Sequence, residues 1–416
     1  MTISSRGSHK YFLAYFLFLF ICFTLKEKTL GEEAIRPLYY TGLIGLFAGV
    51  CIISFKFLFV SSKQMLSTLR IPLVTAFLSL YCIMILNTIG IPGRSLKDAL
   101  LGSGLDIWLF LLLLLYSLVE KISLDSIAAG FAKFVLYTSI GSAILGIVIF
   151  IGDMQIPLGP ITLKQQPYFY GRIIGHLGEP THLGALIGAG MISAFYLLHL
   201  KGKKRYGIAL FFLSIVLIMS GSRNAVVSSM LAILTMAFCI HPLQSVLTAI
   251  LILCAVLAVG YIAVSYSEEA SLLLIASFRI GDEGGQERLD IWAKAIYILN
   301  NSSFLELLLG HGYGYQESEM GASFNQILKF TIDFGLSFVV CFLYVIGYAF
   351  SVFARNIRRG GAHLLGMALL IYSLVFSMFI EVIFASFFHF ASFSFLFSIL
   401  VASRRTNISL KYTENK

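Results

Sequence analysis

Charged residues are scarce in this chain. Only 12% of its 416 residues are Asp, Glu, Lys or Arg, and 58% are hydrophobic. A soluble domain has about 25% charged residues, so this scarcity excludes a soluble globular protein. The composition predicts an all-α polytopic integral membrane protein, with residues 1–416 forming a single transmembrane domain.

Cysteine is also scarce, and the spacing of the cysteines fits no metal site. The six cysteines all lie in apolar stretches, at no metal-ligand spacing: Cys22, Cys51, Cys82, Cys239, Cys254 and Cys341. This excludes a zinc site or a disulfide framework built on them. A nucleotide loop is lacking too, because the glycine-rich Leu309–Tyr315 has no strand and helix around it. We expect no metal and no cofactor.

Long apolar stretches dominate what is present. A membrane span needs about 20 mainly apolar residues, and we count about twelve such stretches. They are residues 11–26, 39–60, 71–90, 99–118, 126–152, 181–199, 206–220, 224–240, 243–264, 323–350, 363–384 and 386–402. The last two are divided only weakly, around Ala385, so a count of eleven stays open.

The net charge of +9 is unevenly distributed. Lys and Arg gather in alternate loops: Arg6 and Lys10; Lys63 and Arg70; Lys201, Lys203, Lys204 and Arg205; Arg355, Arg358 and Arg359; and Arg404, Arg405, Lys411 and Lys416. By the positive-inside rule these loops and both termini are cytoplasmic. The positive charge is therefore a topology signal, and we expect no nucleic-acid partner.

Two segments on the opposite, outer side are too long to be plain connectors. They are residues 153–180 and residues 265–322. In the second, Leu289, Trp292, Ile296 and Leu299 recur at the spacing of one helix face. We expect an amphipathic helix near residues 286–301 that lies in the membrane interface.

Arg223 lies in the short break Ser220–Asn224 between two apolar stretches, on the outer side. Arginine is costly at this depth, and the backbone N–H groups of the following helix start would converge with its guanidinium. Such a site suits a lipid-linked diphosphate. Arg288 either joins this site or snorkels to the interface, and Arg172 and Arg279 either join it or contact lipid head groups.

Three residues are candidate proton acceptors. Glu179 precedes Pro180 at a predicted helix start, so it and His182 serve either the helix start or general base catalysis. His311, in the glycine-rich turn, is a third candidate base or a bystander. We expect His389 to be a core residue with a hydrogen-bonded neighbour, and Lys329 and Asp333 to form a structural pair one turn apart.

The motifs together resemble one family. In order they are Gly178–Thr181, Ser220–Asn224, Arg288–Trp292, Leu309–Gly314, Asn325–Leu328 and Asp333–Leu336. Their order and membrane placement are similar to those of the O-antigen polymerase and O-antigen ligase superfamily, over about residues 170–345.

The resemblance implies a glycosyltransferase of the bacterial inner membrane, with a GT-C-like architecture of about 12 transmembrane helices. It would transfer a glycan from undecaprenyl diphosphate at the periplasmic face, with Arg223 and Arg288 matching the family's arginines. The implied partners are an undecaprenyl-diphosphate-linked oligosaccharide and membrane lipids. Whether a chain-length regulator also binds stays open.

Within the superfamily the residues favour a polymerase. Ligases place a histidine just before the asparagine that starts the following span, whereas here Phe324 precedes Asn325. An O-antigen ligase is the first alternative. A polysaccharide lipid transporter or flippase is the second, although the chain lacks the two similar halves that transporters often show.

Overall fold

The computed structural model describes the residues that follow. They are 15, 18–19, 32–58, 67–89, 104–120, 122–152, 156–158, 161–163, 173, 177, 179–240, 284–321, 325–357, 361–380, 383 and 389–405. Nearly all of them are helical. The exception with regular structure is a small antiparallel pair of strands, β1 (Ile156–Leu158) and β2 (Ile161–Leu163), between α8 (Leu124–Gly152) and α9 (Pro180–Lys201).

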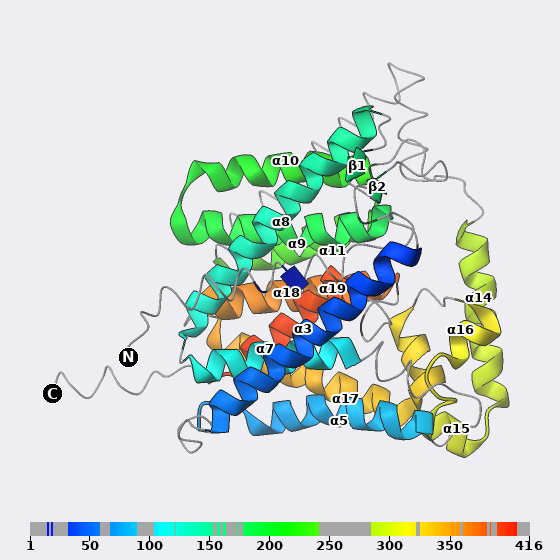
Figure 1. Ribbon diagram of the computed structural model, residues 1–416. Helices are drawn as coiled ribbons and strands as arrows, with labels where there is room; N and C mark the ends of the chain where they lie inside the picture. The colour runs from blue at the N-terminus through cyan, green and yellow to red at the C-terminus, as the bar shows by residue number, and fades with distance from the viewer. Residues whose placement is uncertain are drawn as a thin grey trace.

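The helices follow the apolar pattern closely (Figure 1). They are α3 (Glu32–Leu58), α5 (Ile71–Ile89), α7 (Gly104–Val119), α8 (Leu124–Gly152), α9 (Pro180–Lys201), α10 (Lys204–Ser220), α11 (Arg223–Ile240), α14 (Gly284–Asn301), α15 (Phe304–Leu309), α16 (Tyr315–Met320), α17 (Gln326–Asn356), α18 (Gly361–Ser377) and α19 (Phe390–Ser403). Ten of the expected stretches thus coincide with helices. The stretch 243–264, most of 11–26, and Ala385 lie outside the described residues.

Six described helices are long and apolar enough to cross a membrane: α3, α5, α8, α9, α11 and α17. Helices α7, α18 and α19 are apolar but shorter. Because a bilayer core of about 30 Å requires such lengths, the chain is a helical, membrane-embedded protein.

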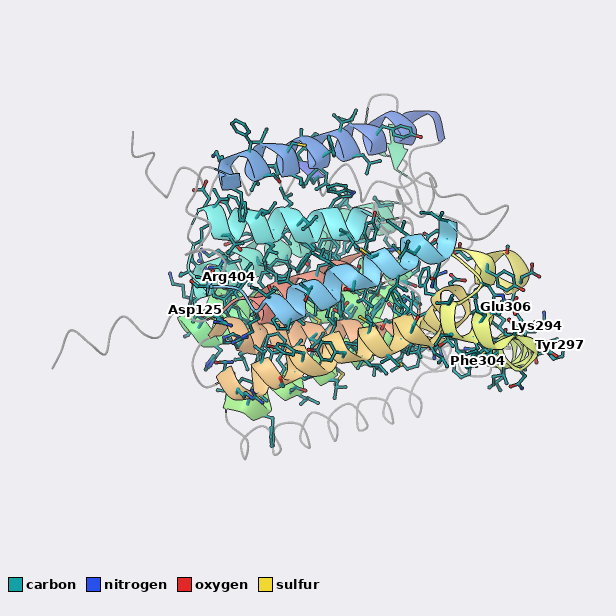
Figure 2. The ribbon with its side chains drawn as sticks, turned by 90° about the horizontal axis from the view of Figure 1, so that it is seen from below. Asp125, Lys294, Tyr297, Phe304, Glu306 and Arg404 are labelled. Carbon is teal, nitrogen blue, oxygen red and sulfur yellow. The ribbon has the colours of Figure 1, made fainter. Side chains whose placement is uncertain are left out.

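The bundle has two ends, which we call basal and distal. At the basal end Arg404 donates to the Ser117 carbonyl oxygen (2.9 Å), and the Asp125 carboxylate accepts from the backbone N–H of Ala362 (3.0 Å). Figure 2 shows Asp125 and Arg404 at this end and Phe304 and Glu306 at the opposite, distal end. Helices α9, α11, α17 and α19 all begin at the distal end.

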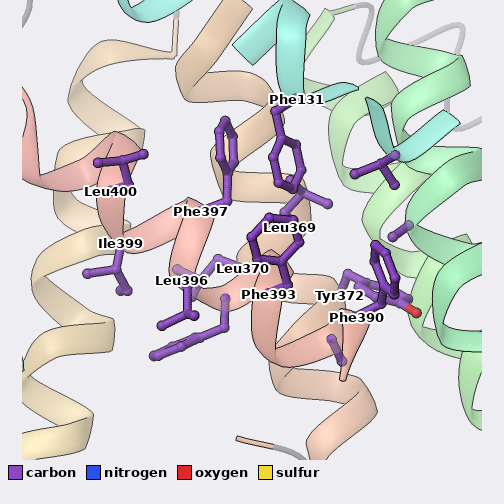
Figure 3. Packing of buried hydrophobic residues seen from close by; sticks show 14 of the residues in the cluster. Phe131, Leu369, Leu370, Tyr372, Phe390, Phe393, Leu396, Phe397, Ile399 and Leu400 are labelled. Atoms are coloured by element: carbon purple, nitrogen blue, oxygen red, sulfur yellow. The ribbon is translucent and has the colours of Figure 1, made fainter. Parts of the chain in front are cut away.

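The core packs around α9, most of which is buried. Small residues let neighbouring helices approach it: a Cβ at Gly190 would lie 2.5 Å from the Cβ of Ser139 on α8. Aromatic rings fill the space between α8 and α19, where Phe131 stacks on Phe397 with ring centroids 3.8 Å apart (Figure 3). This packing fixes the axial position of α9, and with it the residues at its distal start.

Candidate functional site

The start of α9 carries a carboxylate and an imidazole. Glu179 occupies the N-cap with an extended backbone, and Pro180 takes the first helical position, where no N–H is needed. The Glu179 side chain makes no cap hydrogen bond, and its Oε2 lies 3.2 Å from Nε2 of His182. The helix start favours the charged carboxylate. The His182 side chain is mostly shielded, with 10% of it exposed, whereas 32% of the Glu179 side chain is exposed.

A second histidine adjoins this pair. His389 is the N-cap of α19, and its Nδ1 accepts the backbone N–H of Ala391 (3.1 Å). Because Nδ1 is the acceptor, a neutral imidazole there carries its proton on Nε2. The rings of His182 and His389 have centroids 4.7 Å apart. A carboxylate and two imidazoles therefore lie together where α9 and α19 begin.

The break between α10 and α11 adjoins the same part of α9. Gly221 ends α10 with a left-handed backbone (φ 64°), and α11 begins at Arg223. A Cβ at Gly184 would lie 2.6 Å from Oγ of Ser222, so the break packs directly on α9, about one turn beyond Pro180. The hydroxyl of Ser222 is buried and has no hydrogen-bond partner among the described residues. The Arg223 side chain is exposed.

Helix starts concentrate positive potential at the distal end. Besides α9, α11 and α19, helix α17 begins there, with Asn325 capping the N–H groups of Ile327 and Leu328. Gln326 joins this start to the α18–α19 connection by two hydrogen bonds with the backbone of Ile383. Each helix start carries about half a positive charge. The distal end is therefore suited to an anionic ligand.

Asp106 is a distal carboxylate that sequence reasoning missed. It lies in the first turn of α7, is 3% exposed, and accepts a hydrogen bond from the Ser392 hydroxyl in the first turn of α19 (2.7 Å). One available signal was its position inside an apolar stretch, where an ionisable residue is costly and commonly functional. Asp106 thus contacts the start of α19 through Ser392, whereas Glu179 reaches it through His182 and His389.

His311 lies in a different environment from Glu179 and His182. Its Nε2 is 2.8 Å from Oγ of Ser302, its Nδ1 is 3.9 Å from Glu306, and its ring stacks on Tyr315. The backbone N–H of His311 donates to the Ile332 carbonyl oxygen (2.8 Å), which seats the glycine-rich turn on α17. The described contacts therefore place His311 within the α14–α16 region.

The structure describes the four predicted diphosphate-binding arginines to different extents. Arg223 lies at the start of α11, as the motif indicated. Arg288 lies in α14, which covers the helix expected near residues 286–301, and only its backbone is described. Arg172 and Arg279 lie outside the described residues. The predicted pair of Lys329 and Asp333 is confirmed, with Nζ and Oδ2 3.3 Å apart.

The comparisons with known protein families and with curated protein sequences found no match. No group of three His, Cys, Asp or Glu side chains that could hold a metal ion occurs in the described parts of the chain. The carboxylate–imidazole pair of Glu179 and His182 can accept a proton, and a guanidinium beside a helix start can bind a phosphate.

Proposed function

We propose that this protein is a surface-polysaccharide polymerase of the O-antigen type. It would transfer a glycan from undecaprenyl diphosphate onto a second lipid-linked repeat unit. In this proposal the chain crosses the bacterial inner membrane about twelve times, in a GT-C-like arrangement. Both termini are cytoplasmic, and the distal end faces the periplasm. The order of the sequence motifs and the alternation of basic loops support this assignment.

The proposal rests on the contact between the starts of α11 and α9. The start of α11, with Arg223 and the buried Ser222 hydroxyl, packs on the first turns of α9, which carry Glu179 and His182. The helix start that carries the cationic group and the helix start that carries the proton acceptors therefore contact each other at one end of a membrane-embedded bundle. A transferase whose leaving group is a lipid diphosphate needs both.

The proposed reaction is a displacement at the anomeric carbon of the donor glycan. The acceptor hydroxyl forms the new glycosidic bond, and its proton passes to Glu179 or His182. The bond from the anomeric carbon to the diphosphate breaks, and undecaprenyl diphosphate leaves with the electron pair. Arg223 stabilises the charge that develops on it, together with the helix starts and, by family resemblance, Arg288. A chain-length regulator is a proposed further partner.

The test is a gel of surface lipopolysaccharide from a strain that lacks the gene, complemented with variants. We expect wild type to restore a ladder, and Arg223→Ala, Arg288→Ala or His182→Ala to leave lipid A core with a single repeat. Arg355→Ala and His199→Ala are matched controls. Both residues are exposed and lie in the last turns of α17 and α9, far along these helices from the proposed site. The controls should restore the ladder.

Other outcomes identify other functions. Bare core, with long polymer retained on undecaprenyl diphosphate, would show a ligase. An unchanged ladder in the deletion strain would contradict the O-antigen assignment. Polymer formation by the purified protein, from lipid-linked repeat units alone, would separate a polymerase from a flippase, which moves its substrate without forming a bond.

A further inference from the structure

Helix α15 exposes an unusual amount of apolar surface for a short outer helix. Phe304 is 80% exposed and Leu305 is 65% exposed, and Leu308 and Leu309 follow on the same side one turn later. Leu289 and Ile296 extend this exposed surface along α14. We call these six residues the α14–α15 patch. It differs from the expected face of α14, because Trp292 and Leu299 are only partly exposed and turn toward the protein.

The patch is built on a firmly held element. Ser303 and Glu306 form a capping box at the start of α15, with the Ser303 backbone N–H 2.7 Å from Glu306 Oε2. At the other end, Asn87 of α5 donates a hydrogen bond to the Leu309 carbonyl oxygen. Because both ends of α15 are fixed, its four exposed apolar side chains are presented in one orientation.

The patch continues the exposed apolar surface of two membrane-crossing helices. On α5, Leu86 and Ile89 are more than half exposed, on either side of the Asn87 that binds α15. On α17, Val340 is 66% exposed. In Figure 1, α15 lies beside the distal ends of α5 and α17. The α14–α15 patch is thus the distal extension of the surface that these helices present to lipid.

Charged residues mark where this surface stops. Asp290 and Lys294 of α14 are exposed and lie about 100° and 140° around the helix from Leu289, by the turn angle of an α-helix. Figure 2 shows Lys294 and Glu306 at the outer margin of the distal end. A helix with an apolar side and a separate charged side is the arrangement that lies at a membrane surface.

We propose that the α14–α15 patch is a lipid-contacting surface. The apolar side of α15 is immersed among the acyl chains of the leaflet at the distal end, and α14 lies along the head groups with Lys294 in water. The α14–α16 region is thereby held at the membrane surface by lipid as well as by α17. This placement does not depend on the proposed polymerase activity, since it follows from the exposed apolar surface and its continuity with α5 and α17.

Site-specific photocrosslinking tests the proposal. A diazirine amino acid is introduced at position 305 of the full chain, which is reconstituted in nanodiscs of phosphatidylethanolamine and phosphatidylglycerol. Position 340 is the lipid-facing reference and position 294 the water-facing control. After illumination, intact-protein mass spectrometry should show lipid adducts at position 305 at a yield near that of position 340 and several-fold above that of position 294. Position 304 is a second probe if position 305 impairs folding.

Two results would overturn the assignment. An adduct yield at positions 304 and 305 as low as at position 294 would place the patch in water. A crosslinked dimer at these positions, in place of lipid adducts, would show that a second copy of the chain covers the patch. Neither result would bear on whether the protein is a polymerase, because the gel assay measures that separately.

Discussion

Two helix breaks at the distal end each occur at a glycine with a positive φ, but different groups surround them. Gly221, between α10 and α11, and Gly335, inside α17, both have a positive φ, of 64° and 79°, but ψ is 17° at Gly221 and 175° at Gly335. The first break presents the exposed Arg223 and the Ser222 hydroxyl, which lacks a described partner. The second is enclosed by other parts of the chain.

The break in α17 is filled by protein groups. The glycine-rich turn packs so closely on Gly335 that a Cβ there would lie 2.5 Å from the Gly310 backbone nitrogen. Asn87 donates to the carbonyl oxygens of Leu309 and Phe334 (2.9 Å for the latter). Asp333 accepts from the backbone N–H groups of Gly314 (3.3 Å) and Gln316 (2.9 Å).

The difference shows how to separate a structural break from a binding site in a membrane protein. Backbone groups at membrane depth need partners, because lipid offers none. Where the chain supplies those partners, as around Gly335, the break serves to attach the α14–α16 region. Where a cationic side chain lies at a helix start, as at Arg223, the proposed function places an external anion as its partner. Substitutions at the two breaks should therefore affect different properties.

The largest effect is expected at Gly335. Gly335→Ala adds positive-φ strain of about 1–3 kcal/mol and overpacking of about 1–3 kcal/mol, so little folded protein should be recovered. Gly347→Ala, on the same helix, is the matched control, since nothing lies within 4 Å of its Cβ position. Fluorescence-detected gel filtration after heating measures both. Equal stability of the two variants would contradict the tight contact with Gly310.

The next largest effect is expected at Asp333. Asp333→Ala removes a fully buried carboxylate that faces the Lys329 ammonium, and breaking a buried ion pair costs about 3–5 kcal/mol. Adding Lys329→Met to this variant should recover part of the loss, because the buried charge is also removed. Thermal unfolding of the two variants and wild type in one detergent gives the comparison. If the double variant recovers no thermal stability, the unpaired charge of Lys329 is not the cause of the loss.

Arg223 should show the opposite behaviour, with activity lost and the fold kept. Arg223→Ala is expected to lower polymer formation about a hundredfold, the effect of removing one group that stabilises developing negative charge. Its thermal stability should match wild type, because the side chain is exposed. Arg223→Lys should retain intermediate activity, since a point charge replaces a two-pronged donor. A destabilised Arg223→Ala variant would make this break structural, like that at Gly335.

The smallest effect is expected at the α15 cap. Ser303→Ala removes the N-cap hydroxyl that accepts from the Glu306 backbone N–H (3.3 Å), a loss of about 1 kcal/mol. Hydrogen exchange should become faster in α15 and stay unchanged in α9. Unchanged exchange in α15 would show that Asn87 and the Gly310 contact hold this helix without its cap.

The same cap predicts a pH dependence. Hydrogen bonds from the side chain and then the backbone N–H of Ser303 lower the pKa of the Glu306 carboxyl below its ordinary value. A lowered folded-state pKa stabilises the fold above the unfolded-state pKa, and this contribution is lost as the pH falls through the folded-state value. The protection of the α15 amides, taken relative to the intrinsic exchange rate at each pH, should therefore fall on acidification, and Glu306→Gln should remove this pH dependence.

Much of the fold was predictable from sequence. Apolar stretches such as 181–199 and 224–240 became α9 and α11, because burial in lipid demands a continuous apolar helix. The i,i+4 pair of Lys329 and Asp333 was also predictable, since one turn of helix brings such residues together. Pattern alone placed Leu289 and Trp292 on one face of α14, whereas packing against the protein leaves Leu289 exposed and Trp292 partly covered.

The candidate site was only partly predictable. Glu179, His182 and Arg223 could be named because they stand at helix starts. The proximity of His182 to His389, which are 207 positions apart (389 − 182), has no local signature. The hydrogen bond between Ser392 and Asp106 has none either. The seating of His311 on α17 instead follows from Gly310 and Gly335, whose missing side chains permit the contact.

Local sequence is sufficient to predict that this chain is a bundle of membrane helices, where most of them lie, and which polar residues stand at helix starts. These are local properties, since they depend on apolar runs and on the special backbone needs of proline, glycine and caps. The packing of the folded chain settles three further points: which helix starts meet, which break is closed by the chain, and which apolar surface remains exposed. Those outcomes depend on how closely helices approach, and small residues such as Gly184 and Gly335 set that distance only in combination with their partners.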